Sequence, residues 1–151
     1  MKRYFKLTTI FSLLMLLTVA FAGVASADII RGKGWLHAEG SGFAKLQMTG
    51  QVEINGHGVG AVYIYGAESI RADGDGKRSD LRGGGVVFRG FEGTIHVTGQ
   101  RMVVKMLGSD IDFTARGKGR AVLRGNGTYE TGDGGSGDWQ PDGLNIEVVE
   151  E

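Results

Sequence analysis

The chain contains no cysteine and only one proline, Pro141. The missing cysteine excludes disulfide bonds, a cysteine nucleophile and a lipid attached through a thiol. The single proline, without a Gly-X-Y period, excludes a collagen-like structure. Packing must therefore hold the chain together, and residues 28–151 are enough to bury about two-thirds of their surface.

The chain also lacks an excess of positive charge beyond its N-terminus. Three of the 17 Lys and Arg lie in residues 1–27, whereas all 17 Asp and Glu follow, so residues 28–151 carry a net charge of −3. A nucleic-acid-binding domain is expected to be strongly basic. The composition therefore argues against a nucleic acid as partner.

One long apolar run is present, at the N-terminus. Three basic residues within the first six precede the uncharged segment 7–24, and Ala25-Ser26-Ala27 places small residues at the −3 and −1 positions of a signal-peptidase site. We predict a helical signal peptide over 1–27, cleaved after Ala27, and export to the periplasm, cell envelope or medium. A retained membrane anchor is the alternative, because the run is about long enough to span a bilayer.

Glycine is abundant, with 28 residues, and it takes part in an alternating pattern. In 38–54 the even positions are small or apolar and the odd positions are largely polar, and ARGKGRAVLRGNGTY (115–129) alternates in the same way. Side chains alternate between the two faces of a β-strand, and no helical period is present in 28–151. We predict one all-β domain over 28–151, either an antiparallel sandwich or a closed barrel of about 10–12 short glycine-rich strands.

Glycine-containing breaks delimit the predicted strands, and the longest loop is expected at 72–85. In the Gly- and Asp-rich tail (133–151), residues 144–149 form either an edge strand or a loose end. The predicted strands are 33–40, 43–49, 51–56, 59–66, 68–73, 85–90, 93–99, 101–107, 110–117, 119–124 and 127–131.

A weak internal repeat relates residues at an offset of 77, such as Ala38 to Ala115 and Leu46 to Leu123. It is a two-copy relation, without the many short copies that a solenoid needs.

Four glycines on the inward face, Gly40, Gly42, Gly117 and Gly119, are expected at bends where long strands turn a corner. Room for a bound ligand is the alternative explanation for these small residues. The bulk of the core is predicted from Leu46, Val52, Ile54, Val62, Ile64, Ile70, Phe88, Ile95, Val97, Met102, Val104, Met106, Ile111, Phe113, Leu123 and Tyr129.

No catalytic or metal-binding constellation stands out. The three histidines have no ligand-like spacing: His57 lies in a predicted turn, and His37 and His96 are expected to face solvent. No serine lies in a nucleophile-elbow pattern. We therefore assign no catalytic, cofactor-binding or metal-binding residue and expect no cofactor.

Two acidic motifs resemble calcium loops. Asp73-Gly74-Asp75-Gly76 fails the EF-hand pattern because Lys77 and Arg78 follow it, and Gly134–Asp138 is a single copy of a nonapeptide-like sequence. We interpret both as solvated turns.

Two further motifs concern the surface. Arg116, Lys118, Arg120 and Arg124 form a basic stripe if they share one strand face, and we favour a solvated face balanced by acids on neighbouring strands. Asn126-Gly127-Thr128 fits the short glycosylation sequon.

Two long runs carry a resemblance: IDFTARGKGRAVLRGNGTYETGDGGSGDW and GWLHAEGSGFAKLQMTGQVEING. Together they resemble a group of small, exported, glycine-rich prokaryotic proteins of uncharacterised function. The resemblance covers most of residues 28–151 and implies an all-β exported domain. It brings no catalytic or binding residues with it.

These observations favour a non-enzymatic protein of the cell envelope or medium that acts by binding or assembly. Its envelope or extracellular partner is unidentified, its oligomeric state is open, and no transmembrane segment remains after signal cleavage. A small-ligand binder that uses the interior or mouth of a β-barrel is the alternative, and a hydrolase ranks third. We also expect Trp139 to fold back from the tail and cover one open end of the β-structure.

Overall fold

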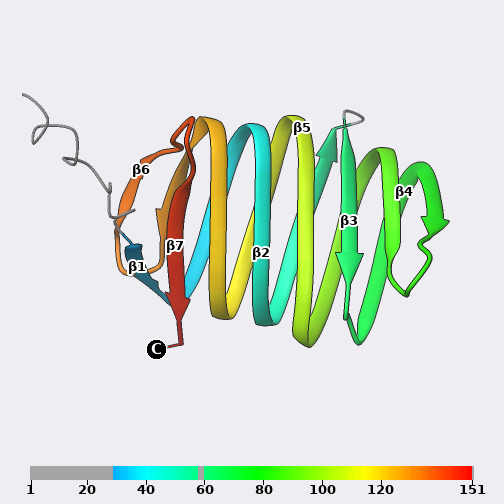
Figure 1. The fold of residues 1–151 in the computed structure, drawn as a ribbon, viewed down its shortest axis with the longest axis horizontal. Helices are drawn as coiled ribbons and strands as arrows, with labels where there is room; N and C mark the ends of the chain where they lie inside the picture. The colour runs from blue at the N-terminus through cyan, green and yellow to red at the C-terminus, as the bar shows by residue number, and fades with distance from the viewer. Residues whose placement is uncertain (1–28, 58–59, 151) are drawn as a thin grey trace, which may run out of the picture.

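The computed structural model describes residues 29–57 and 60–150, which form a single seven-stranded sheet without a helix (Figure 1). The all-β prediction is confirmed, whereas the predicted signal peptide lies outside the described residues. The strands are β1 (Ile29–Lys33), β2 (Trp35–His57), β3 (Ala61–Tyr65), β4 (Ser69–Asp80), β5 (Val86–Thr131), β6 (Ser136–Asp138) and β7 (Leu144–Val149).

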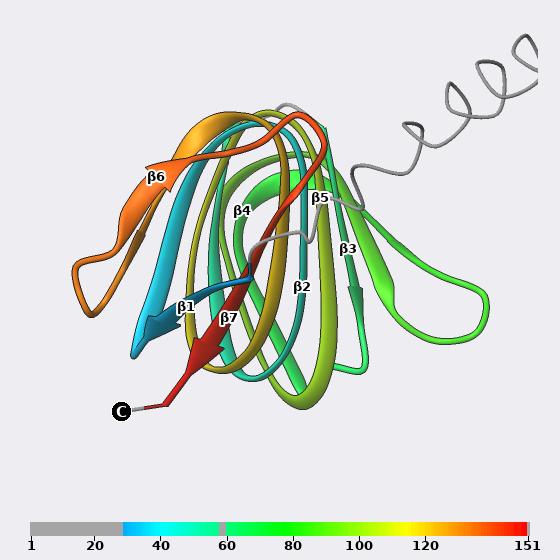
Figure 2. The same ribbon diagram turned by 60° about the vertical axis from the view of Figure 1, so that its left-hand side comes forward.

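The sheet winds round one core as an open coil (Figure 2). The chain first follows the coil from one end to the other through β2, β3 and β4. It reverses at 81–85, and β5 then winds back between the turns of these three strands. Successive turns of β2 therefore flank the same part of β5: Phe113 is paired with both Ala38 and Ile54, which are 16 residues apart. The chain thus interleaves an outgoing path with a returning one.

The number and length of the strands differ from the prediction. The sheet is not closed into a barrel, and it contains seven strands, of which β2 has 23 residues and β5 has 46. The predicted segments 43–49 and 51–56 are both parts of β2, and those from 93–99 to 119–124 are parts of β5. Pairing continues through glycines such as Gly50, Gly74 and Gly117, because glycine lets a strand bend sharply while its neighbours bend with it. The predicted break at 83–85 is confirmed, since it lies between β4 and β5.

Glycines of adjacent strands face one another at these bends. Gly50 is paired with both Gly99 and Gly117. A Cβ atom added at Gly40, Gly42, Gly117 or Gly119 would overlap a carbonyl oxygen of the adjacent strand. The close approach of two backbones, rather than room for a ligand, therefore explains these four glycines.

The interior of the coil is filled by the apolar members of the alternating pattern. Phe113, at the centre, is completely buried, and the predicted core residues all belong to the core or pack against it. Phe88 and Phe91 meet edge to face, with ring centroids 5.4 Å apart. The alternation therefore identified the inside of the molecule correctly.

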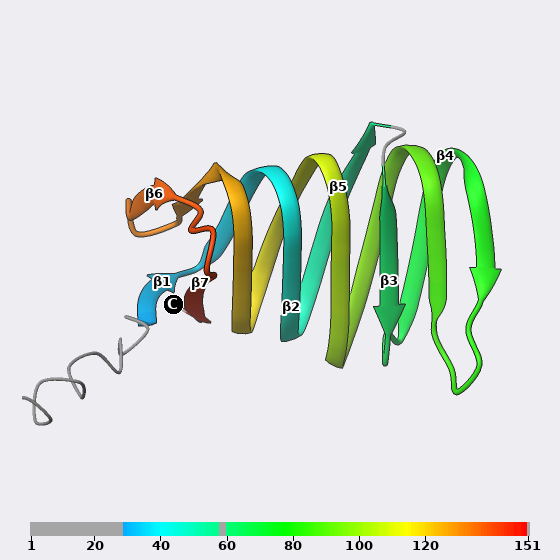
Figure 3. The ribbon, with the colours of Figure 1, turned by 45° about the horizontal axis from the view of Figure 1, so that its top comes forward.

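The C-terminal tail packs against the end of the coil that carries β1 and β6 (Figure 3). Trp139 is 3% exposed and belongs to the core, and its indole Nε1 donates a hydrogen bond to the carbonyl oxygen of Thr128 at 3.0 Å. The prediction that Trp139 folds back is confirmed.

Three other expectations need correction. The predicted loop 72–85 is mostly strand, because β4 continues to Asp80 and pairs with β5. β7 is a strand but no edge, since it lies between β1 and β5. The offset of 77 is not the spatial period of the coil. Two residues that are paired with the same third residue, from either side, are 16 to 18 positions apart, as Phe88 and Met106 are on either side of Val62.

Substitutions at Gly119 and at its neighbour Lys118 test which residues face the inside of the coil and which face the outside. A side chain at Gly119 would overlap Gln47 and Met48 of β2, so Gly119→Val should lower the free energy of unfolding by roughly 1–3 kcal/mol. Lys118→Val, at the adjacent exposed position, should change it by no more than about 0.5 kcal/mol. Denaturant unfolding measures both, and equal small effects would contradict the assignment.

Candidate functional site

The coil has two facing layers, which are joined by the bends. One layer contains β3 and β7, and the other contains β6 and the first part of β4. The first layer also includes 43–47, 86–89, 103–107 and 120–124, and the second includes 35–39, 51–55, 94–98, 112–116 and 128–131.

The outer surfaces of the two layers differ in charge. The outer surface of the β3 layer, here termed the basic face, carries the cations Lys45, Arg89, Lys105, Arg120 and Arg124, together with Glu147 of β7. The outer surface of the β6 layer, here termed the acidic face, carries Glu39, Glu53, Asp73, Asp112, Glu130 and Asp138, with Arg71 and Arg116 as cations.

The cations of the basic face outnumber its acids. Lys45 and Lys105 are directly opposite each other on adjacent strands. None of the five cations forms an ion pair with a carboxylate of the described residues. The Nζ atom of Lys105 instead lies 5.6 Å from the centre of the Tyr65 ring, a cation–π distance. This face therefore holds an excess of positive charge.

The predicted basic stripe is divided by the bend at 117–119. Arg116 lies on the acidic face, whereas Arg120 and Arg124 lie on the basic face. We expect acids on neighbouring strands to balance these cations, and Arg120 does have an acid, Glu147, as its cross-strand neighbour. The Glu147 carboxylate, however, forms its ion pair with Arg31, whose Nε atom is 3.2 Å away. Sequence reasoning missed Lys45 and Lys105, because only the register of the coil brings these two lysines together.

A hydrogen-bonded cluster on the acidic face centres on His37. Its Nε2 atom lies 3.1 Å from Oε1 of Glu39, and its Nδ1 atom lies 3.1 Å from the carbonyl oxygen of Phe113 and 3.8 Å from Oδ1 of Asp112. Asn55 donates to the other carboxylate oxygen of Asp112 at 3.0 Å. Asp112 Oδ1 is buried without a hydrogen-bond partner. His37 is thus held between two carboxylates.

The same three side chains could hold a divalent cation, since one ligand atom of each of His37, Glu39 and Asp112 lies within 4.8 Å of the others. Imidazole and carboxylate are ordinary zinc ligands. His37 lies on the outer surface as predicted, but its side chain is only 31% exposed. The spacing of His37 and Glu39 on one strand face is visible in the sequence, whereas the approach of Asp112 from β5 is not.

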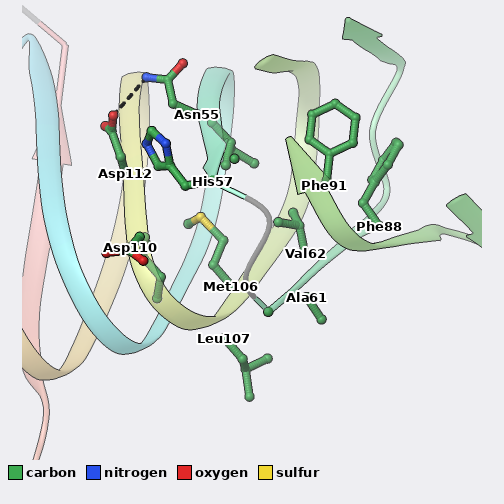
Figure 4. Close-up of a pocket in the computed structure, with 14 residues that line it drawn as sticks. Asn55, His57, Ala61, Val62, Phe88, Phe91, Met106, Leu107, Asp110 and Asp112 are labelled. Carbon is green, nitrogen blue, oxygen red and sulfur yellow. Dashed lines mark hydrogen bonds between the residues drawn. The ribbon is translucent and has the colours of Figure 1, made fainter. Parts of the chain in front are cut away.

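Two hollows lie beside this cluster. The first, in Figure 4, is lined partly by Val62, Phe88, Phe91 and Met106, and its volume is about 30 Å³. Small-molecule sites usually have volumes of about 300 Å³ or more. The second is an open hollow of about 620 Å³ on the acidic face, lined by Glu39, Gly40, Ser41, His57, Asp110, Ile111, Asp112, Gly127 and Thr128.

The other sequence candidates are dispersed. The interpretation of Asp73-Gly74-Asp75-Gly76 as a turn is wrong, because these residues lie within β4, which pairs with β5. Asp73 and Asp75 are exposed and belong to no three-ligand cluster of the described residues. His96 is exposed, with Nδ1 3.4 Å from Oε2 of Glu53, and His57 ends β2. Asn126 of the sequon is exposed at a bend.

The 131–138 turn is organised by Thr131. Its buried hydroxyl donates to Oδ1 of Asp133 at 2.6 Å, and this hydrogen bond lowers the pKa of the Asp133 carboxyl. The Asp133 carboxylate is therefore bound within its own turn. The interpretation of Gly134–Asp138 as a turn is wrong for residues 136–138, which form β6 and pair with β5.

In residues 29–57 and 60–150, no helix is long and apolar enough to cross a membrane. Comparisons with protein-family models, with curated proteins and with solved structures find no match to this chain. The resemblance to small exported glycine-rich proteins thus stays an expectation from the sequence.

Proposed function

We propose that this chain is an exported, non-enzymatic protein of the cell envelope, a two-layered β-sandwich that acts by binding a polyanion through its basic face. The apparent signal peptide supports the location. The separation of charge between the two faces supports the mode of action, since the net charge of −3 on residues 28–151 would not by itself attract an anion.

The pairing of Lys45 with Lys105 carries the proposal. Like charges directly opposite each other on neighbouring strands destabilise a sheet, by a few tenths of a kcal/mol to about 1 kcal/mol. No described carboxylate offsets this repulsion. An anionic partner would offset this repulsion. Binding such a partner therefore explains the two lysines, whereas the stability of the sheet does not.

Small-ligand binding is the second candidate, and the open hollow on the acidic face supports it. A small cation is the ligand class that fits, because Glu39, Asp110 and Asp112 line the hollow. We place a hydrolase third. The Thr114 hydroxyl lies 3.1 Å from Nδ1 of His37, but that nitrogen also lies 3.1 Å from the carbonyl oxygen of Phe113, to which it donates, so it is not a base for the hydroxyl.

Co-sedimentation with isolated cell envelopes tests the leading proposal. The triple variant Lys45→Gln/Lys105→Gln/Arg124→Gln should bind at least about tenfold more weakly, because each cation near an anionic surface contributes about 1 kcal/mol. The loss should shrink at high salt, which screens exposed charges.

The matched control removes three other exposed cations, in the variant Arg71→Gln/Arg116→Gln/Lys118→Gln. It has the same net charge as the basic-face variant and should bind envelopes like the unaltered protein. Equal losses in the two triple variants would contradict a localised binding surface.

A further inference from the structure

The basic face also exposes apolar and aromatic side chains among its cations. Leu107 is 44% exposed and lies directly opposite Phe43, which in turn is paired with Arg124. Tyr63 is paired with Lys105, and Tyr65 lies beneath the Lys105 ammonium group. Val103 and Val122 are half-buried on the same surface. A purely electrostatic site for a soluble polyanion would not need these outward apolar groups.

Cations interspersed with apolar and aromatic side chains suit the region of a lipid bilayer where the headgroups meet the acyl chains. Phosphate groups attract lysine and arginine, tyrosine rings favour the headgroup level, and exposed leucine and phenylalanine gain by entering the acyl boundary. Long basic side chains also cover apolar surface with their methylene groups while the charge stays in water.

We propose that the occupant of the basic face is the surface of a bilayer that contains anionic phospholipids. This inference rests on the proposed function and names its partner. Lys45, Lys105 and Arg124 contact lipid phosphates, and Leu107 and Phe43 enter the boundary between headgroups and acyl chains. The acidic face is repelled by the same surface, so the coil lies on the bilayer in one orientation.

Vesicle co-sedimentation tests the proposal with protein from the exported fraction. Mass spectrometry first establishes the N-terminus, because a retained segment 7–24 would bind bilayers by itself. All variants share that N-terminus, so differences between them report on the faces of the coil. The protein should bind vesicles of phosphatidylglycerol and phosphatidylcholine, and should bind pure phosphatidylcholine at least tenfold more weakly.

Two variants separate the electrostatic and apolar contributions. Lys45→Gln/Lys105→Gln/Arg124→Gln should reduce the partition coefficient about 100-fold at low salt, at about fivefold per charge. Leu107→Asn should reduce it by about tenfold, and this loss should persist at high salt because it is not electrostatic. Arg71→Gln/Arg116→Gln/Lys118→Gln should leave it unchanged, and thermal unfolding verifies that each variant is folded.

Three outcomes would overturn the inference. Envelope binding that depends on the basic face, with binding to dextran sulfate but not to vesicles, would leave the proposed function standing and point to an anionic polysaccharide. Self-association at low salt without vesicle binding would point to a second copy, with its acidic face on the basic face. Vesicle binding equal in both triple variants would remove the role of the basic face, and with it the proposed function.

Discussion

Trp139→Ala should lower the free energy of unfolding by about 3–5 kcal/mol, the usual cost of truncating a buried large aromatic side chain. Trp139 is 3% exposed, and its backbone N–H and indole N–H both bond to β5, at the carbonyl oxygens of Gly127 and Thr128. The loss would open the end of the core and release the segment that leads into β7. Urea-induced unfolding, followed by circular dichroism, measures the effect.

Trp35→Ala is the matched control, because Trp35 is half-buried on the outside of the coil. It should cost less than half as much. Fluorescence supplies a second measurement: in Trp35→Phe, the remaining Trp139 should emit at short wavelength and resist quenching by iodide. Emission like that of free indole in water, or a cost of less than about 1 kcal/mol for Trp139→Ala, would show that the tail does not cap the core.

Gly50→Ala should destabilise the protein by about 3 kcal/mol or more, and this variant tests the bends of the coil. Gly50 has a φ of +136°, where an alanine costs about 1–3 kcal/mol in backbone strain. The added methyl group would also overlap the carbonyl oxygen of Arg116 on the adjacent strand. Since that oxygen belongs to backbone, relief requires the two strands to separate.

Gly134→Ala distinguishes backbone strain from the close approach of strands. Gly134 also has a positive φ, +88°, but its added Cβ would have no heavy atom within 4 Å. We expect a cost of about 1 kcal/mol, as for strain alone. If both variants lose the same stability, crowding at the bend has no role; if Gly50→Ala does not fold while Gly134→Ala does, the bend is essential.

The sequence predicted which side chains lie inside because alternation depends only on local geometry. Ile54 and Phe113 were both assigned to the core, and both are buried. The sequence did not predict that these residues lie side by side, or that strands continue through the breaks. Glycine signals either the end of a strand or a bend within it, and only the register of the neighbouring strands decides between the two.

The candidate site was harder to predict than the core for the same reason. Lys45 and Lys105 are 60 residues apart in sequence, yet they are direct cross-strand neighbours. Conversely, Arg116 and Arg120 are four residues apart but lie on opposite layers, because the bend at 117–119 separates them. The prediction of a basic stripe from alternating charges therefore failed where the strand passes from one layer to the other.

The interleaved winding dictates the order in which the chain can fold. Asp80 pairs with Val86 across the reversal, whereas Leu36 pairs with Thr131, near the other end of the domain. Closing the short loop costs little entropy, so we expect pairing to start at the reversal and to proceed toward both termini. We also expect slow folding, because many of the paired residues are far apart in sequence. The N-terminal half has no partner strand until the C-terminal half has been synthesised. A chain built in this way cannot assemble piece by piece as it is synthesised, and it completes its fold only when its last strand is available.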